Sequence, residues 1–297
     1  MTDETSIITY QEKEAKSFES IRVEEFASGF EFTEGPVWHL DGYLLFSDTP
    51  ANKIWQIFAD GRKQLWLDPA GLLHDDLSNL SDMVGSNGLA FDQAGHLLIC
   101  QHGEHAISRL EKNGKLTVLC NEYEGRSLNS PNDLVVHSKG AIYFTDPPYG
   151  LKDQILNPSR HQSFAGIFRY SNDQLVLLND DLRYPNGICF SPDEKFLYVS
   201  SNHPDEPLIL KFSLSPSGDI RTESILIEQN ADGITTDKRG NLLLCTDKGV
   251  LVVSPSGLRV ALIPLPQSPT NIAWHSSKTE LYITARKSIY KITGYKG

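Results

Sequence analysis

An internal repeat of six similar segments constrains the fold of this chain more than any other feature of its sequence. Each segment begins with Asn, Asp or Glu and contains two short apolar stretches that flank a tight turn. The segments start 39 to 54 residues apart and read EGPVWHLDGYLLFSD, NGLAFDQAGHLLICQH, NDLVVHSKGAIYFTD, NGICFSPDEKFLYVSSN, DGITTDKRGNLLLCTD and NIAWHSSKTELYITAR. Two apolar stretches around a tight turn predict a β-hairpin in every segment.

A second pair of apolar stretches follows each of the first four hairpins. These pairs are KIWQIFADGRKQLWL, AISRLEKNGKLTVLC, GIFRYSNDQLVLL and LILKFSLSPSGDIRTESIL. Four strands in about 40 to 50 residues are typical of a propeller blade, and helical periodicity is nearly absent. A β-sandwich is the second choice, but it gives no reason for so regular a period. We therefore predict an all-β fold, a six-bladed β-propeller.

The last repeat leaves too little chain for four strands. We expect residues 20–28 (SIRVEEFAS) to supply an outer strand that closes the ring. Residues 1–18 are expected to form a loose or surface-packed N-terminal lead. Because no tract rich in Gly, Ser or Pro divides the rest, residues 19–297 are predicted to be a single propeller domain.

Composition narrows the classes of partner. The chain has 27 Lys and Arg against 38 Asp and Glu, a net charge of −11, which argues against a nucleic-acid-binding surface. No apolar run reaches the roughly 18 residues of a membrane-spanning helix, and the polar N-terminus has no signal-peptide core. The four cysteines lack metal-type spacing and are predicted to be buried thiols. We expect a cytoplasmic protein, and the sequence gives no signal for an oligomeric state.

The first residue of each repeat bears a side-chain oxygen. These residues are Glu34, Asn87, Asn132, Asn186, Asp232 and Asn271. Equivalent positions of the blades lie on a ring around the channel, so the six side chains are expected to converge at one mouth. Carboxylate and amide oxygens without thiolate or imidazole favour a hard cation such as Ca²⁺. The alternative at each position is a turn cap that bonds its own backbone, although Glu34 is a poor turn residue.

A second ring is expected at the polar ends of the second strands. It comprises Asp48, His102, Asp146, Asn202, Asp247 and Arg286, and some members are expected to orient the metal ligands. His102 has the only near-neutral ordinary pKa in this ring, which makes it a candidate for proton transfer or substrate binding. The alternative is a solvated loop histidine. The loop at residues 147–150 (PPYG) is a candidate lid over the mouth, with an ordinary turn as the alternative.

Motifs of several other enzyme classes are missing from the sequence. There is no GxSxG, no P-loop and no GxGxxG, which leaves serine hydrolases, nucleotide hydrolases and dinucleotide-binding enzymes without support. The histidines show no HxH or HExxH spacing, so a zinc centre is not favoured.

Several segments together resemble the gluconolactonase/regucalcin (senescence marker protein) family, and above all bacterial gluconolactonase-like sugar lactone lactonases. They are EGPVW, SNGLAFD, SPNDLVV with IYFTDPPYG, PNGICFSPDEKFLYV, ADGITTDKRGN and LYITA, and the resemblance runs from about residue 26 to residue 291. It implies a six-bladed propeller with one divalent cation, typically calcium, with Zn, Mn, Mg or Fe as alternatives.

The same resemblance implies roles for individual residues. Glu34, Asn186 and Asp232 match the metal ligands, Asp232 also matches the proton-transfer residue, and Asn132 matches a residue that contacts substrate or a metal-bound water. Animal members have Arg where this chain has Ser130. The polar contact of that Arg with a sugar lactone is therefore missing here or comes from elsewhere.

The expected function is metal-dependent hydrolysis of a lactone, such as gluconolactone, at the channel mouth. Asp232 is the first candidate for the base and His102 the second; His102 is also expected to contact substrate, together with Asn132. Two alternatives stay open. One is a non-catalytic propeller that presents a protein-binding surface, and the other is a hydrolase of other lactones or of organophosphate esters.

Overall fold

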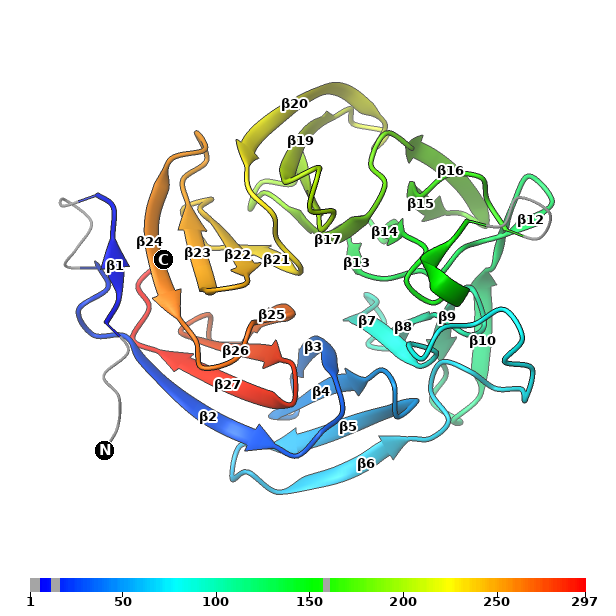
Figure 1. The fold of residues 1–297 in the computed structure, drawn as a ribbon, viewed down its shortest axis with the longest axis horizontal. Helices are drawn as coiled ribbons and strands as arrows, with labels where there is room; N and C mark the ends of the chain where they lie inside the picture. The colour runs from blue at the N-terminus through cyan, green and yellow to red at the C-terminus, as the bar shows by residue number, and fades with distance from the viewer. Residues whose placement is uncertain (1–5, 12–16, 157–160) are drawn as a thin grey trace.

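A computed structural model describes residues 6–11, 17–156 and 161–297 of the chain. Six antiparallel sheets surround a central channel, which confirms the predicted six-bladed β-propeller (Figure 1). The described residues contain no α-helix, and a short 3₁₀ segment covers Lys152–Gln154. Within these ranges, no helix has the length and apolar character needed to span a bilayer.

We number the blades by the chain order of their innermost strands. Blade 1 consists of β3 (Thr33–His39), β4 (Tyr43–Asp48), β5 (Lys53–Phe58) and β6 (Lys63–Leu67). Blade 2 consists of β7 (Ser86–Phe91), β8 (Leu97–Gln101), β9 (Ala106–Leu110) and β10 (Leu116–Cys120). Blade 3 consists of β13 (Leu134–Val136), β14 (Ile142–Asp146), β15 (Gly166–Ser171) and β16 (Gln174–Asn179). A small hairpin of β11 (Glu122–Tyr123) and β12 (Arg126–Ser127) precedes blade 3.

The second half of the chain repeats this organisation. Blade 4 consists of β17 (Pro185–Phe190), β18 (Phe196–Ser201), β19 (Leu208–Leu214) and β20 (Ile220–Glu228). Blade 5 contains β21 (Ile234–Thr236), β22 (Leu242–Thr246), β23 (Gly249–Val253) and β24 (Arg259–Pro264). Blade 6 contains β25 (Asn271–Trp274), β26 (Glu280–Ala285) and β27 (Ser288–Thr293).

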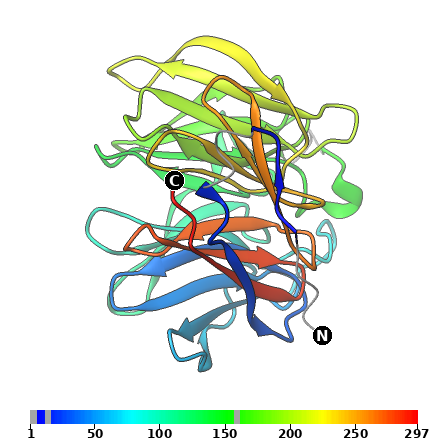
Figure 2. The same cartoon turned by 90° about the vertical axis from the view of Figure 1, so that its left-hand side faces the viewer.

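The N-terminal region completes the last two blades. The strand β2 (Arg22–Ser28) pairs antiparallel with β27, so the predicted closure of the ring by residues 20–28 is confirmed. The short strand β1 (Ile8–Thr9) pairs with β24 at the outer edge of blade 5 (Figure 2). The predicted lead over residues 1–18 lies in part outside the described residues. Within them, Phe18 is buried and its ring lies 5.8 Å from that of Tyr295.

The hydrophobic core is a ring of six clusters, each between two neighbouring blades. Between blades 2 and 3, for example, Leu98 and Cys100 pack with Phe144 and Phe168. All four cysteines are free and buried, as the sequence predicts. The second strands of the blades, such as β4, β8, β14 and β22, are buried along their whole length, so both of their faces pack against neighbouring blades.

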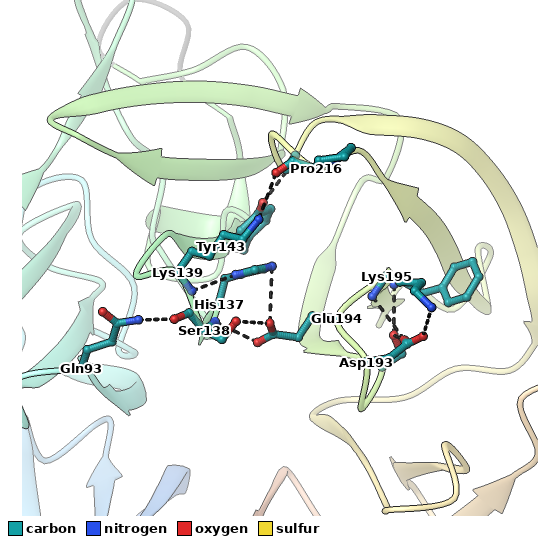
Figure 3. Close-up of polar contacts among 12 residues, drawn as sticks. Gln93, His137, Ser138, Lys139, Tyr143, Asp193, Glu194, Lys195 and Pro216 are labelled. Atoms are coloured by element: carbon teal, nitrogen blue, oxygen red, sulfur yellow. Dashed lines mark hydrogen bonds and ion pairs between the residues drawn. The ribbon is translucent and has the colours of Figure 1, made fainter.

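The hairpin turns between the first and second strands are also linked from blade to blade (Figure 3). In the turn of blade 2, the Gln93 amide donates to the carbonyl of Ser138 in blade 3. The backbone N–H of Ser138 donates to Glu194 Oε1 of blade 4 at 2.8 Å, and His137 Nε2 lies 3.5 Å from Glu194 Oε2. These turns lie at the end of the innermost strands opposite the repeated oxygen-bearing residues, and they fix three blades there.

Candidate active site

The innermost strands are irregular where the repeated oxygen-bearing residues occur. In β7, Ser86 pairs with Gln101 and Leu89 with Ile99, so two residues oppose one on β8. The same shift occurs in β17 at Asn186–Gly187 and in β3 after Glu34. Such β-bulges bend a strand and re-aim its side chains. They turn the first residues of the repeats toward the channel mouth.

A glycine follows four of the six repeated residues and allows the next blade to come close. The N–H of Gly88 donates to Asn132 O at 2.7 Å, and that of Gly187 donates to Asp232 O at 3.2 Å. A Cβ atom at Gly187 would lie 2.6 Å from Asp232 O, which is closer than side chains tolerate. The repeated glycine therefore lets each blade support the polar residue of the next.

Hydroxyl groups on the second strands hold the same residues from behind. Ser47 Oγ donates to Asn87 O, Thr145 Oγ1 to Asn186 O and Ser200 Oγ to Asp232 O, each at 2.7 Å. Each bond runs from one blade to the next and is buried or half-buried. The main chain at the mouth is consequently fixed by inter-blade packing rather than by loops.

A cavity of about 240 Å³ lies at the mouth. Its lining brings together the residues to which the sequence assigns a metal-binding, catalytic or substrate-binding role: Glu34, His102, Asn132, Asn186 and Asp232. Phe32, Met83, Asn87, Tyr149, Gln154, Asn202 and Arg286 complete the wall. Asn271 departs from the expected ring, because its Oδ1 accepts the N–H of Ile272 and its amide bonds to Asp133.

The amide side chains form a chain of hydrogen bonds across the cavity wall. Asn87 Nδ2 donates to Asn132 Oδ1 at 3.0 Å, and Asn132 Nδ2 donates to Asn186 Oδ1 at 2.9 Å. Asn186 Nδ2 in turn donates to the hydroxyl of Tyr149 at 3.2 Å. This chain fixes the orientation of each amide and runs through blades 2, 3 and 4 to the loop above them.

Two acidic side chains meet in the cavity under unfavourable conditions. Burial and the nearby charges of Asp232 and Asp133 raise the pKa of Glu34 well above its ordinary range. Burial also raises the pKa of the half-buried Asp232, while the charge of Arg286 and a hydrogen bond from Asn186 lower it. Two ionised carboxylates here are costly without a cation, because each repels the other in a poorly solvated site.

The donor set fits a hard divalent cation. Asn186 Oδ1 has a second lone pair beside the hydrogen bond from Asn132, and the buried Asn87 Oδ1 lacks a hydrogen-bond partner among the described residues. Oxygen donors of this kind suit Ca²⁺. The described residues contain no group of three or more His, Cys, Asp and Glu that could hold a metal. Any cation here therefore depends on amide oxygens as well as the two carboxylates.

His102 is buried and uncharged. Its Nδ1 donates to the carbonyl of Met83 at 2.8 Å, and burial lowers the pKa of the imidazole to about 4. Nε2 is also buried and makes no hydrogen bond of ordinary geometry with the residues described. His102 is thus no solvated loop residue, and its neutral ring presents an acceptor nitrogen to the cavity.

The second predicted ring does not form as a ring. His102, Asn202 and Arg286 line the cavity, but Asp48 and Asp146 do not. Asp48 Oδ1 accepts the N–H groups of Glu31 and Phe32, at 3.1 and 3.0 Å, and Asp146 Oδ2 accepts that of Asn129 at 2.8 Å. The sequence predicted that some members of this ring orient metal ligands, and these two aspartates lie outside the cavity wall. They instead secure the segments that lead into β3 and β13.

The PPYG loop contributes a wall residue that the sequence did not single out. Ser130 Oγ donates to Pro147 O at 2.5 Å and accepts the N–H of Gly150 at 2.9 Å. Ser81 Oγ donates to Tyr149 O at 2.8 Å, which ties the loop before β7 to it. These contacts hold Tyr149 in the cavity wall, and a lid function of the loop stays a prediction. An aromatic residue in a conspicuous Pro-rich loop was the only signal for Tyr149.

Comparisons with known proteins agree with this architecture. Residues 32–287 match the protein family described as SMP-30/Gluconolactonase/LRE-like region. A gluconolactonase from Zymomonas mobilis is 32% identical over 92% of this chain and 81% of its own length. The structure of a gluconolactonase from Xanthomonas campestris has a TM-score of 0.83 and 27% identity, covering 97% of this chain and 94% of that one. A regucalcin from Agrobacterium tumefaciens, described as a calcium-binding protein, shares the fold with a TM-score of 0.71 and 18% identity over 90% of this chain and 91% of its own.

Proposed function

The chain belongs to the SMP-30/gluconolactonase/LRE-like family, and from this premise we propose that its cavity hydrolyses a lactone with the help of one divalent cation. The likeness to two gluconolactonases makes the chain a lactonase. One observation supports the rest of the proposal: Glu34, Asn186 and Asp232 come from three different blades and line one cavity. A non-catalytic binding platform has no need for such convergence.

Glu34, Asn186 and Asp232 are the residues that would hold the cation. Calcium is the first choice, since the donors are all oxygens, and Zn, Mn, Mg or Fe are alternatives. A bound cation would polarise the lactone carbonyl as a Lewis acid. The substrate is a small-molecule lactone, with a sugar lactone such as gluconolactone as the first candidate. The cytoplasmic location expected from the sequence stays a prediction.

Asp232 is proposed to act as the general base. Asp232 lines the cavity, and its carboxylate can take a proton from water, as a general base must. The water oxygen bonds to the lactone carbonyl carbon as Asp232 takes the proton. The ring C–O bond then breaks, and the proton passes to the departing ring oxygen, which gives the open-chain hydroxy acid.

His102 and Asn132 are proposed to orient the substrate. The Nε2 of the neutral His102 accepts a hydrogen bond from a substrate hydroxyl, because the Met83 carbonyl holds the ring proton on Nδ1. Asn132 stands between Asn87 and Asn186 in the amide chain, so its side chain has a fixed direction toward the reacting ring. Such positioning lowers the entropy lost on reaching the transition state.

Proton release from glucono-1,5-lactone, measured on chelated protein before and after addition of Ca²⁺, Mn²⁺ or Zn²⁺, tests the proposal. We expect chelation to abolish hydrolysis and the metals to restore it to different degrees. Thermal unfolding of the same samples separates loss of a catalytic group from loosening of the fold, because a bound metal also stabilises the native state. Full activity in a sample shown to be metal-free by elemental analysis would overturn the proposed centre.

A further inference from the structure

Arg286 places a cationic side chain in the wall of the cavity at the mouth. It directly follows β26, is exposed, and has a backbone φ of 50°, in the left-handed region. Its guanidinium carbon lies 5.2 Å from the ring centre of Phe32. Among the described residues, no hydrogen bond or ion pair of the guanidinium is found. An uncommon backbone conformation thus holds an arginine whose N–H groups remain available.

Arg286 lies where two cavities adjoin. The second cavity, of about 320 Å³, shares Asn202, Asp232 and Arg286 with the first. The rest of its wall is rich in uncharged polar groups such as Asn230, Thr246 and Ser268, with one acidic side chain, Asp247. Among the described lining residues of both cavities, Arg286 is the only Lys or Arg. A ligand that extends from one cavity into the other must pass it.

The surroundings favour a carboxylate as the partner of this guanidinium. It lines the same cavity as Glu34 and Asp232, yet it makes no ion pair with either carboxylate within the described residues. Contact with the Phe32 ring restricts the guanidinium plane and leaves its N–H edges free. A planar fork of this kind matches the two oxygens of a carboxylate better than a single hydroxyl does.

We propose that Arg286 binds a carboxylate of the substrate and that the preferred substrate is a lactone bearing a second, ionised carboxylate, such as the lactone of a sugar diacid. The inference rests on the proposed lactone hydrolysis and names the class of lactone. The reacting ring lies in the cavity with Asp232, and the carboxylate lies at the boundary beside Arg286.

Two commercially available lactones test the proposal directly. D-Glucaro-1,4-lactone and D-glucono-1,4-lactone differ only at the end of the carbon chain, where the first has a carboxylate and the second a hydroxymethyl group. We expect the metal-loaded protein to prefer the glucaro-lactone at least about tenfold in kcat/KM, as a charge-assisted contact implies. Arg286→Gln should abolish the preference and Arg286→Lys should retain part of it. Lys287→Gln is the control: it removes the exposed charge of the residue that follows Arg286 and should keep the full preference.

Two results would overturn the proposal: no preference in the natural protein, or an equal loss on both lactones in Arg286→Gln. The second would mean that Arg286 acts on Glu34 and Asp232 rather than on substrate. If neither lactone is hydrolysed, lactone hydrolysis fails as the function of this cavity, and calorimetric titration with D-glucaro-1,4-lactone decides about Arg286. Binding at least about tenfold weaker in Arg286→Gln supports the anion site, whereas equal or undetectable binding in both proteins overturns it.

Discussion

Replacement of Gly187 by alanine is expected to damage the site without touching any side chain in it. Gly187 follows Asn186 in the β-bulge of blade 4, and its backbone packs directly on Asp232 of blade 5. The added Cβ would lie 2.6 Å from Asp232 O and 2.7 Å from Ile234 N. Both are backbone atoms, so no side chain can rotate out of the way.

The size of the effect follows from these distances. Ordinary contact begins at 3.4 Å, so a separation of 2.6 Å requires blade 5 to retreat by about 0.8 Å. Overpacking of this kind costs about 1–3 kcal/mol. Weakening the bonds that Asp232 O accepts from Gly187 N and Ser200 Oγ adds about 1 kcal/mol. We expect a total loss of about 2–4 kcal/mol in the free energy of unfolding, or about 3–6 °C in Tm for a chain of this length.

Activity is expected to fall further than stability alone explains. A displacement near 1 Å at a reacting group can cost up to about a hundredfold in rate, so kcat/KM for glucono-1,5-lactone should fall about tenfold or more well below the Tm. Gly114→Ala is the matched control. Gly114 has a φ of 82° with open space around it, so alanine there adds about 1 kcal/mol of backbone strain and no clash. If Gly187→Ala loses no more stability and activity than Gly114→Ala, close packing of blade 4 does not position Asp232.

Three further predictions concern single side chains. Glu34→Gln should weaken metal affinity and recover activity in excess metal, whereas Asp232→Asn should keep some metal but lose turnover because an amide cannot take a proton. Calorimetric titrations measure metal affinity and kcat measures turnover. If excess metal restores both variants equally, Asp232 is a ligand only. His102→Ala should leave metal binding intact and lower kcat/KM more for hydroxylated sugar lactones than for aliphatic ones, and equal losses would point to proton transfer. Burial raises the pKa of Asp146 to about 8. Between about pH 4 and pH 8 the folded chain therefore binds more protons at this group than the unfolded chain does. In that range Asp146 lowers the free energy of unfolding by about 1.4 kcal/mol for each unit of rising pH. Urea titrations at several pH values should show that the free energy of unfolding falls less steeply with pH in Asp146→Asn than in the natural protein. The same pH dependence in both proteins would contradict the raised pKa.

The fold could be predicted from the sequence because its determinants are local and repeated. Each hairpin carries its own turn and apolar alternation, and the spacing of the six copies leaves few architectures to choose from. The position of Glu34, Asn186 and Asp232 followed for the same reason, since equivalent positions on blades face one channel. Register within a repeat was therefore enough to bring three distant residues together.

The position of a residue within its repeat did not predict where its side chain lies when a nearer partner competes for that side chain. Asp146 stands in register with His102, but the free N–H of Asn129 lies within reach and captures its carboxylate. Asn271 similarly bonds to Asp133 from another blade. Tyr149 lies outside the repeat altogether, in a loop held by Ser130 and by a second loop, and no periodic signal describes such contacts.

The pairing of β2 with β27 sets the order in which this protein can become active during synthesis. A ribosome needs about 15 to 60 seconds to make a chain of this length, and β2 is among the first strands to emerge while β27 is the last. Until then β2 is an unpaired edge, open to any other strand nearby. Single hairpins can form earlier, but Glu34 in blade 1 joins Asp232 of blade 5 in one cavity only when blade 1 packs on blade 6 and the ring closes. A nascent or prematurely terminated chain thus carries most of the proposed site residues without the assembled site.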